Sequence, residues 1–131
     1  MEYQEYVRSA QRASKLVESG NYEGAIQVLR KLVSSDISRI DKAMMCLNLA
    51  IVYDKMGRLE EALIWYDEGI GYERSHDRHY VAESKAAYLA EKGRYQAALD
   101  EYERLLTRTG LTESDKRRIE RQVATLRKRV G

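Results

Sequence analysis

The sequence predicts an all-α protein built as a short helical solenoid, and three observations support this prediction. Proline is absent from the 131 residues, so nothing in the composition interrupts long helices. A glycine-centred motif occurs three times, with its glycines 37 and 36 residues apart. Apolar residues recur three and four positions apart after each glycine, which is the period of an amphipathic helix.

The three copies of the motif are alike on both sides of the glycine. They run from Gly20 to Ala25, from Gly57 to Ala62 and from Gly93 to Ala98, and a further alanine precedes each glycine by seven residues, at Ala13, Ala50 and Ala86. A glycine in the left-handed conformation ends one helix, and paired alanines let two helix axes approach closely. Each motif therefore predicts a helical hairpin, over about residues 6–36, 42–75 and 78–109.

In chain order, this pattern predicts six helices over residues 2–18, 22–34, 38–56, 59–74, 77–92 and 95–108. A seventh is expected over residues 112–130, because Thr112 opens a capping run and apolar residues follow at helical spacing. Their positions are Ile119, Val123, Leu126 and Val130. A solenoid leaves its last hairpin half uncovered, so we interpret this segment as a capping helix.

Length and composition set further limits. One domain, residues 1–131, is the default for this length, and 44% apolar with 34% charged residues favours a folded chain over disorder. No stretch approaches the roughly 20 apolar residues that span a bilayer, and no signal peptide precedes the first helix. We expect a cytoplasmic protein that makes no membrane contact. The lone Cys46 is expected to be a small buried side chain.

The three glycine motifs and the alanines around them resemble the tetratricopeptide repeat (TPR) family. Its pattern of a small residue, glycine, tyrosine and alanine is matched from about Tyr6 to Leu106. Arg12 and Lys85 stand where that family usually has leucine. The resemblance implies a right-handed superhelical solenoid of three TPR-like hairpins plus the C-terminal capping helix. It also implies a protein-interaction scaffold that binds a partner peptide or helix in its concave groove.

The family's groove positions, carried onto this chain, give the candidate site. They are Val7, Gln11, Ser14, Met44, Leu47, Asn48, Ile51, Lys55, Tyr80, Glu83, Ser84 and Ala87, together with Ala10 and Val17. Some of these side chains are expected to pack between repeats instead. A subclass of the family grips a chaperone's terminal carboxylate, but only Asn48 matches its five polar residues, so this clamp is disfavoured. An apolar floor instead suits an amphipathic helix or an extended segment with apolar anchors.

Two other classes of function, metal binding and catalysis, have little support in the sequence. Glu73, His76, His79 and Glu83 would share a face if residues 73–83 were one helix, but the connection between two hairpins is expected to break there, so no metal site is predicted. No phosphate loop, nucleophile motif or paired catalytic carboxylates occur in a coherent context. We therefore predict that the chain is not an enzyme and needs no cofactor.

The main rival hypothesis rests on the basic C-terminal segment. Residues 111–131 hold seven basic side chains against three acidic ones, so this helix could bind phosphates. Its acidic residues and its lack of aromatics disfavour nucleic acid, which leaves a solvated cap as the simpler interpretation. Its apolar stripe has near-heptad spacing and could also pair two copies as a homodimer. Homo-oligomeric assembly or nucleic-acid association through this helix thus stays the alternative function.

Overall fold

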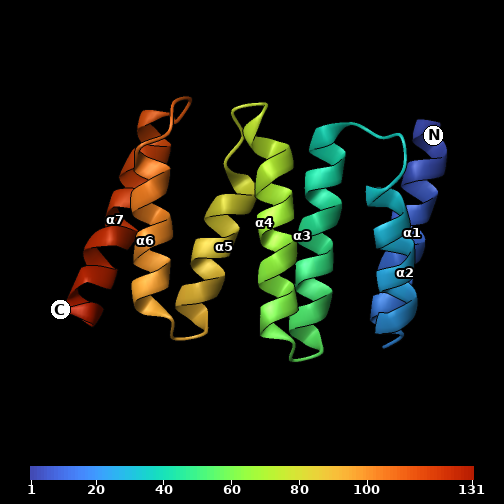
Figure 1. Ribbon diagram of the computed structural model, residues 1–131, viewed down its shortest axis with the longest axis horizontal. Helices are drawn as coiled ribbons and strands as arrows, with labels where there is room; N and C mark the ends of the chain where they lie inside the picture. Colours follow the sequence, from blue (N-terminus) through green and yellow to red (C-terminus); the bar gives the residue numbers. More distant parts are fainter. The chain divides into compact units, whose positions relative to one another are not determined.

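The computed structural model describes residues 1–131 and consists of seven α-helices with no strands (Figure 1). The all-α prediction is confirmed, and every helix begins and ends within three residues of its predicted range. The helices are α1 (Tyr3–Glu18), α2 (Tyr22–Val33), α3 (Arg39–Lys55), α4 (Leu59–Arg74), α5 (Tyr80–Glu91), α6 (Tyr95–Leu106) and α7 (Glu113–Val130).

The chain forms two compact units, Met1–Glu73 and Arg74–Gly131. We call them the N-terminal unit and the C-terminal unit. In the N-terminal unit α2 packs between α1 and α3, and Arg39 of α3 contacts α4 by lying over the Tyr72 ring, 5.1 Å from its centroid. In the C-terminal unit α6 packs between α5 and α7. Each unit is described on its own below.

One turn geometry joins α1 to α2, α3 to α4 and α5 to α6. Gly20, Gly57 and Gly93 have φ of 81°, 74° and 78°, so the predicted left-handed glycine is confirmed in all three hairpins. The amide that follows each glycine donates to the carbonyl five residues earlier, which closes the helix end in a Schellman motif. These bonds are Asn21 to Leu16, Arg58 to Tyr53 and Arg94 to Leu89, at 2.8, 2.9 and 2.9 Å.

The six repeated alanines are all buried, as their role at helix crossings requires. Ala13 is 2% exposed, and the other five, Ala25, Ala50, Ala62, Ala86 and Ala98, are 0% exposed. Any larger side chain at these positions would push two packed helices apart.

The position that is Leu49 in the middle motif is Lys85 in the C-terminal unit, where it forms a half-buried charged pair. Lys85 of α5 donates to Glu101 of α6 at 2.8 Å, and their side chains are only 14% and 12% exposed. The corresponding Leu49 of the N-terminal unit is fully buried. A lysine can occupy this half-buried position because the Glu101 carboxylate on the neighbouring helix pairs with its charge.

The last helix begins as predicted and ends differently. Thr112 and Asp115 form a capping box, and Ile119, Val123 and Leu126 are buried. Val130 was expected to continue this apolar stripe but is 39% exposed. Val130 is the last residue of α7, so no further turn of this helix covers it, although Arg129 beside it still contacts Tyr95 of α6 at 3.2 Å.

Candidate partner-binding sites

The N-terminal unit contains a cavity between α1 and α3 whose floor is Leu29 of α2. Its volume is about 250 Å³. Apolar side chains form most of its wall, with three polar residues among them. The lining residues are Ala10, Ala13, Ser14, Val17, Glu18, Leu29, Asn48, Ile51 and Val52.

This cavity gathers part of the predicted groove. Ser14, Asn48 and Ile51 line it, together with Ala10 and Val17, so α1 and α3 do bring these positions together. The other predicted residues on the two helices do not line it: Val7 and Met44 are half-buried, Gln11 and Lys55 are exposed, and Leu47 lies in the core at 6% exposure. The cavity therefore occupies the middle of the predicted surface.

The polar groups of this cavity have no partners within the protein. The Ser14 hydroxyl and the Asn48 amide make no hydrogen bond, and the Glu18 carboxylate makes no ion pair. Beside them the Ile51 side chain is 41% exposed, which is high for a large apolar residue in the middle of a helix. The cavity thus offers both apolar surface and free hydrogen-bonding groups to a ligand.

The C-terminal unit contains a larger cavity, of about 400 Å³, against α5. All four predicted residues of α5, Tyr80, Glu83, Ser84 and Ala87, line it. The remaining lining residues are Tyr102 of α6 and Arg118 and Gln122 of α7. Helix α7 therefore contributes to this cavity, which the sequence analysis did not predict.

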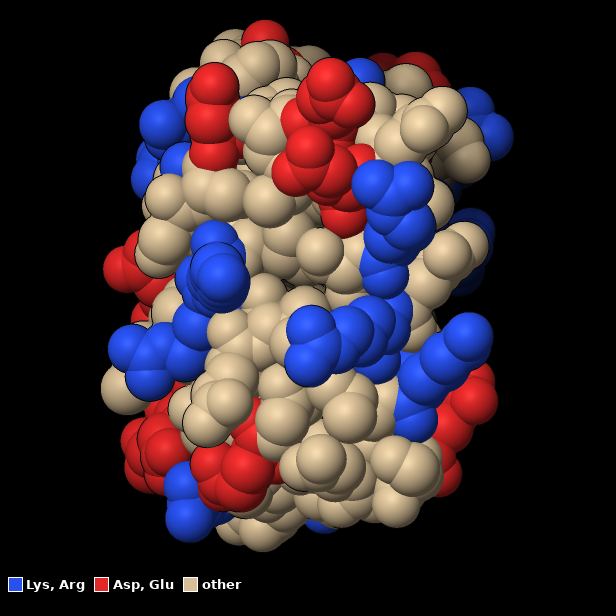
Figure 2. All heavy atoms as spheres, turned by 90° about the vertical axis from the view of Figure 1, so that its right-hand side faces the viewer, with Lys and Arg blue, Asp and Glu red and all other residues tan.

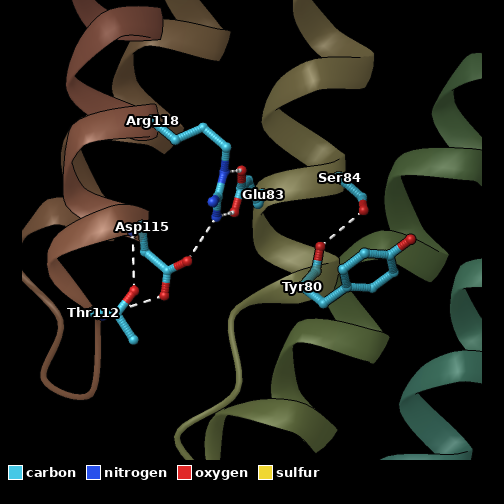
Figure 3. A network of polar contacts seen from close by, with 6 residues as sticks. All are labelled: Tyr80, Glu83, Ser84, Thr112, Asp115 and Arg118. Atoms are coloured by element: carbon cyan, nitrogen blue, oxygen red, sulfur yellow. Dashed lines mark hydrogen bonds and ion pairs between the residues drawn. The ribbon is translucent and has the colours of Figure 1, made fainter.

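Polar groups in this second cavity are held in a network that Figure 3 shows. Arg118 Nε and Nη2 donate to the two carboxylate oxygens of Glu83 at 2.6 and 2.8 Å, and Nη2 also donates to Asp115 at 2.9 Å. Asp115 in turn accepts from the backbone N–H of Thr112 at 3.2 Å. Glu83 is therefore neutralised from within the unit and is not free to bind a partner's cation.

The same network sets the charge states of its members. The hydrogen bond from Arg118, followed by those from Thr112, lowers the pKa of the Asp115 carboxyl below its ordinary value. The hydrogen bond to Glu83 raises the pKa of Arg118 further. Burial raises the pKa of the Tyr102 hydroxyl, and the nearby Glu83 carboxylate adds to the shift. All three therefore keep their usual charge at neutral pH.

Tyr80 is an exposed member of the second cavity. Its side chain is 61% exposed, and Ser84 donates from its hydroxyl to the Tyr80 carbonyl at 2.8 Å (Figure 3). Ser84 is thus partly satisfied by its own helix, unlike Ser14 in the N-terminal unit.

Sequence reasoning missed residues of two kinds. Leu29 and Val52 were not among the predicted groove residues, since nothing in the apolar pattern of a helix separates a cavity wall from a core position. Arg118 lies three residues after Asp115, a spacing that predicts their contact. Its partner Glu83 lies 35 residues away, and no local signal joins them.

The segment between α4 and α5 does not form the histidine face that a continuous helix would give. Asp77 has φ of 53° in this segment, and α5 begins at Tyr80, so His76 and His79 lie outside both helices. No group of three or more His, Cys, Asp or Glu residues is placed to hold a metal ion. None of the seven helices is both long and apolar enough to span a bilayer.

Comparison with protein-family models gives a match over most of the chain. No curated protein matches the sequence. A family model described as a domain of unknown function, DUF6340, matches residues 11–108, a segment that holds the predicted groove residues except Val7 and Ala10 and ends before α7. The chain belongs to the DUF6340 family.

Proposed function

We propose that this chain is a protein-interaction module: a TPR-like solenoid of three hairpins and a capping helix that holds a segment of a partner protein in its groove. The solenoid part of the proposal is supported by the three alike glycine turns and by the buried alanines at equivalent positions in each hairpin. A cytoplasmic location and the absence of catalysis are parts of the same proposal.

The observation that carries the binding proposal is the cavity of the N-terminal unit. Its apolar wall suits one aliphatic or aromatic anchor residue, whose burial contributes about 1.5–3 kcal/mol. The free Asn48 amide can both donate to and accept from a peptide backbone, which adds about 0.5–1.5 kcal/mol per net hydrogen bond. A single anchor of this size gives weak binding, so we expect a segment with two or more anchors.

The rival, assembly or nucleic-acid association through α7, has less support. Its apolar stripe of Ile119, Val123 and Leu126 is buried within its own unit and is not free to pair two copies. Four of its seven cations already have partners: Lys116 with Glu113, Arg118 with Glu83 and Asp115, Arg127 with Glu103, and Arg129 with Tyr95. Only the side chains of Arg117, Arg121 and Lys128 have no partner within the protein and are available to bind phosphates.

The test uses two matched substitutions to aspartate. Ile51→Asp puts a charge in the cavity, whereas Ile64→Asp puts one on α4 at a residue that is 58% exposed and lies outside it. Partners captured by the wild-type chain are identified by mass, and the affinity of the bound segment is then measured for each purified variant. We expect Ile51→Asp to weaken binding at least tenfold and Ile64→Asp to leave it within twofold.

Both variants must retain helical circular dichroism for the comparison to count. Full binding by a folded Ile51→Asp would refute the groove as the binding surface. A loss seen only in Arg117→Glu/Arg121→Glu/Lys128→Glu would favour the rival, particularly if wild-type binding also weakens steeply with salt.

A further inference from the structure

Lysine and arginine gather on the solvent-exposed face that α1 and α2 form in the N-terminal unit. Figure 2 shows them as a band across the middle of this face, with Asp and Glu gathered above and below. The exposed basic residues of the two helices are Arg8, Arg12, Lys15, Arg30 and Lys31, and the exposed acidic ones are Glu5, Glu18 and Glu23. We call Arg8, Arg12, Lys15 and Lys31 the basic band.

Helix geometry places these four residues together. At 100° per residue, Arg8, Arg12 and Lys15 fall within a sector of about 60° on α1. The turn at Gly20 folds α2 back along α1, and Lys31 follows this glycine by nearly as many residues as Arg8 precedes it. Arg8 and Lys31 therefore lie at about the same level along the neighbouring helices α1 and α2, and the band extends from one helix to the other.

The charges of the basic band are not neutralised within the protein. None of its four side chains makes an ion pair or hydrogen bond, in contrast to the four paired cations of α7. Arg30, at the edge of the band, lies over the Trp65 ring at 5.8 Å from its centroid and makes no ion pair. The band is therefore a site of positive potential, although the chain's net charge is only +2.

We propose that the basic band is a docking surface for a short acidic segment of a partner protein. From Arg8 to Lys15 it extends about 10 Å along α1, which matches a few consecutive carboxylates. The carboxylates beyond both ends would repel a phosphate strand that continued past the band, and they would repel an anionic bilayer lying flat on this face. The Trp65 ring at the edge of the band is covered by Arg30, which leaves less of the ring face for a base to stack on.

This surface is distinct from the groove. The α1 residues that line the cavity, Ala10, Ala13, Ser14 and Val17, point on average about 180° away from the band around the helix axis. A substitution in the band therefore leaves the cavity wall unchanged, and the two proposals can fail separately.

The experiment measures binding of a fluorescein-labelled octaglutamate peptide to the full chain by fluorescence anisotropy at low ionic strength. The test variant is Arg8→Glu/Arg12→Glu/Lys15→Glu, and the matched control is Arg117→Glu/Arg121→Glu/Lys128→Glu, which makes the same charge change on α7. We expect the first to weaken binding at least tenfold and the second to leave it within twofold. The milder Arg8→Gln/Arg12→Gln/Lys15→Gln tests the same surface if the reversal does not fold.

Ten-residue oligothymidylate and vesicles with 30% phosphatidylserine are the competing probes. The proposal is overturned if octaglutamate does not bind, if both reversals weaken it equally, or if either competing probe binds more tightly than the peptide through the same residues. An unchanged Ile51→Asp in this assay would show that the peptide binds independently of the groove.

Discussion

The cavities of the two units differ in what their polar groups do. In the N-terminal unit, Ser14 and Asn48 face the cavity with no partner. In the C-terminal unit, Arg118 Nε and Nη2 both donate to the Glu83 carboxylate, and the Ser84 hydroxyl donates to the Tyr80 carbonyl of its own helix. The difference comes from α7, which supplies the arginine. An added helix can therefore turn potential binding groups into structural ones, and we expect the N-terminal cavity to be the stronger anchor.

The largest expected effect concerns the floor of the N-terminal cavity. Leu29 is 2% exposed, so Leu29→Ala should lower the free energy of unfolding by about 2–5 kcal/mol through lost burial and a new void. Tyr102→Phe, at the 4% exposed floor of the other cavity, removes only a hydroxyl and should cost much less. Urea denaturation followed by circular dichroism measures both. Equal losses would mean that Leu29 is not a packed core residue.

A smaller loss in unfolding free energy is expected when the Arg118 side chain is removed from the polar network of the C-terminal unit. Arg118→Ala removes the partner of Glu83 and Asp115, but these side chains are 26% and 31% exposed and the arginine itself is 42% exposed. Solvent screening then limits the loss in unfolding free energy to about 1 kcal/mol or less. The control Arg117→Ala, on the same helix without a partner, should change stability less. A larger loss in the control would contradict this assignment.

The smallest expected effect is on the pKa of the Asp115 carboxyl. Because Arg118 and Thr112 hold the pKa of Asp115 below 3.8, its folded-state pKa is depressed relative to the unfolded chain. This interaction therefore stabilises the protein above that pH, and the contribution is lost as the pH falls through the lowered folded value. A carbon-detected NMR titration should give a midpoint below 3.8 that moves up in Arg118→Ala. A midpoint that does not move would exclude the arginine as the cause.

Much of the fold could be predicted from the sequence because the repeat is a local signal. Gly20, Gly57 and Gly93 each fix a turn through backbone conformation, and the alanines around them must be small whatever else surrounds them. The start of α5 was placed three residues too early, because the polar run before Tyr80 has good helix formers and no glycine to mark the turn at Asp77.

The candidate sites were harder to predict, since they depend on pairs far apart in sequence. All four predicted residues of α5 line one cavity, but nothing near Glu83 reveals that Arg118 neutralises it. Likewise, the sequence indicated the basic residues of α7 as a candidate site, but four of those seven have partners, whereas all four side chains of the basic band on α1 and α2 have none. The sequence gives the number of charged residues, but the packing of the helices determines which of them remain unpaired.

The most direct test of the central claim follows the Asn48 side-chain amide by NMR during a titration with the captured partner segment. We predict that the two amide protons of Asn48 and the Ile51 methyl groups shift in step with binding, and by more than the signals of Tyr80 and Ser84. If the Asn48 and Ile51 signals stay fixed while the segment binds, the N-terminal cavity is not the anchoring site and the proposed function is contradicted.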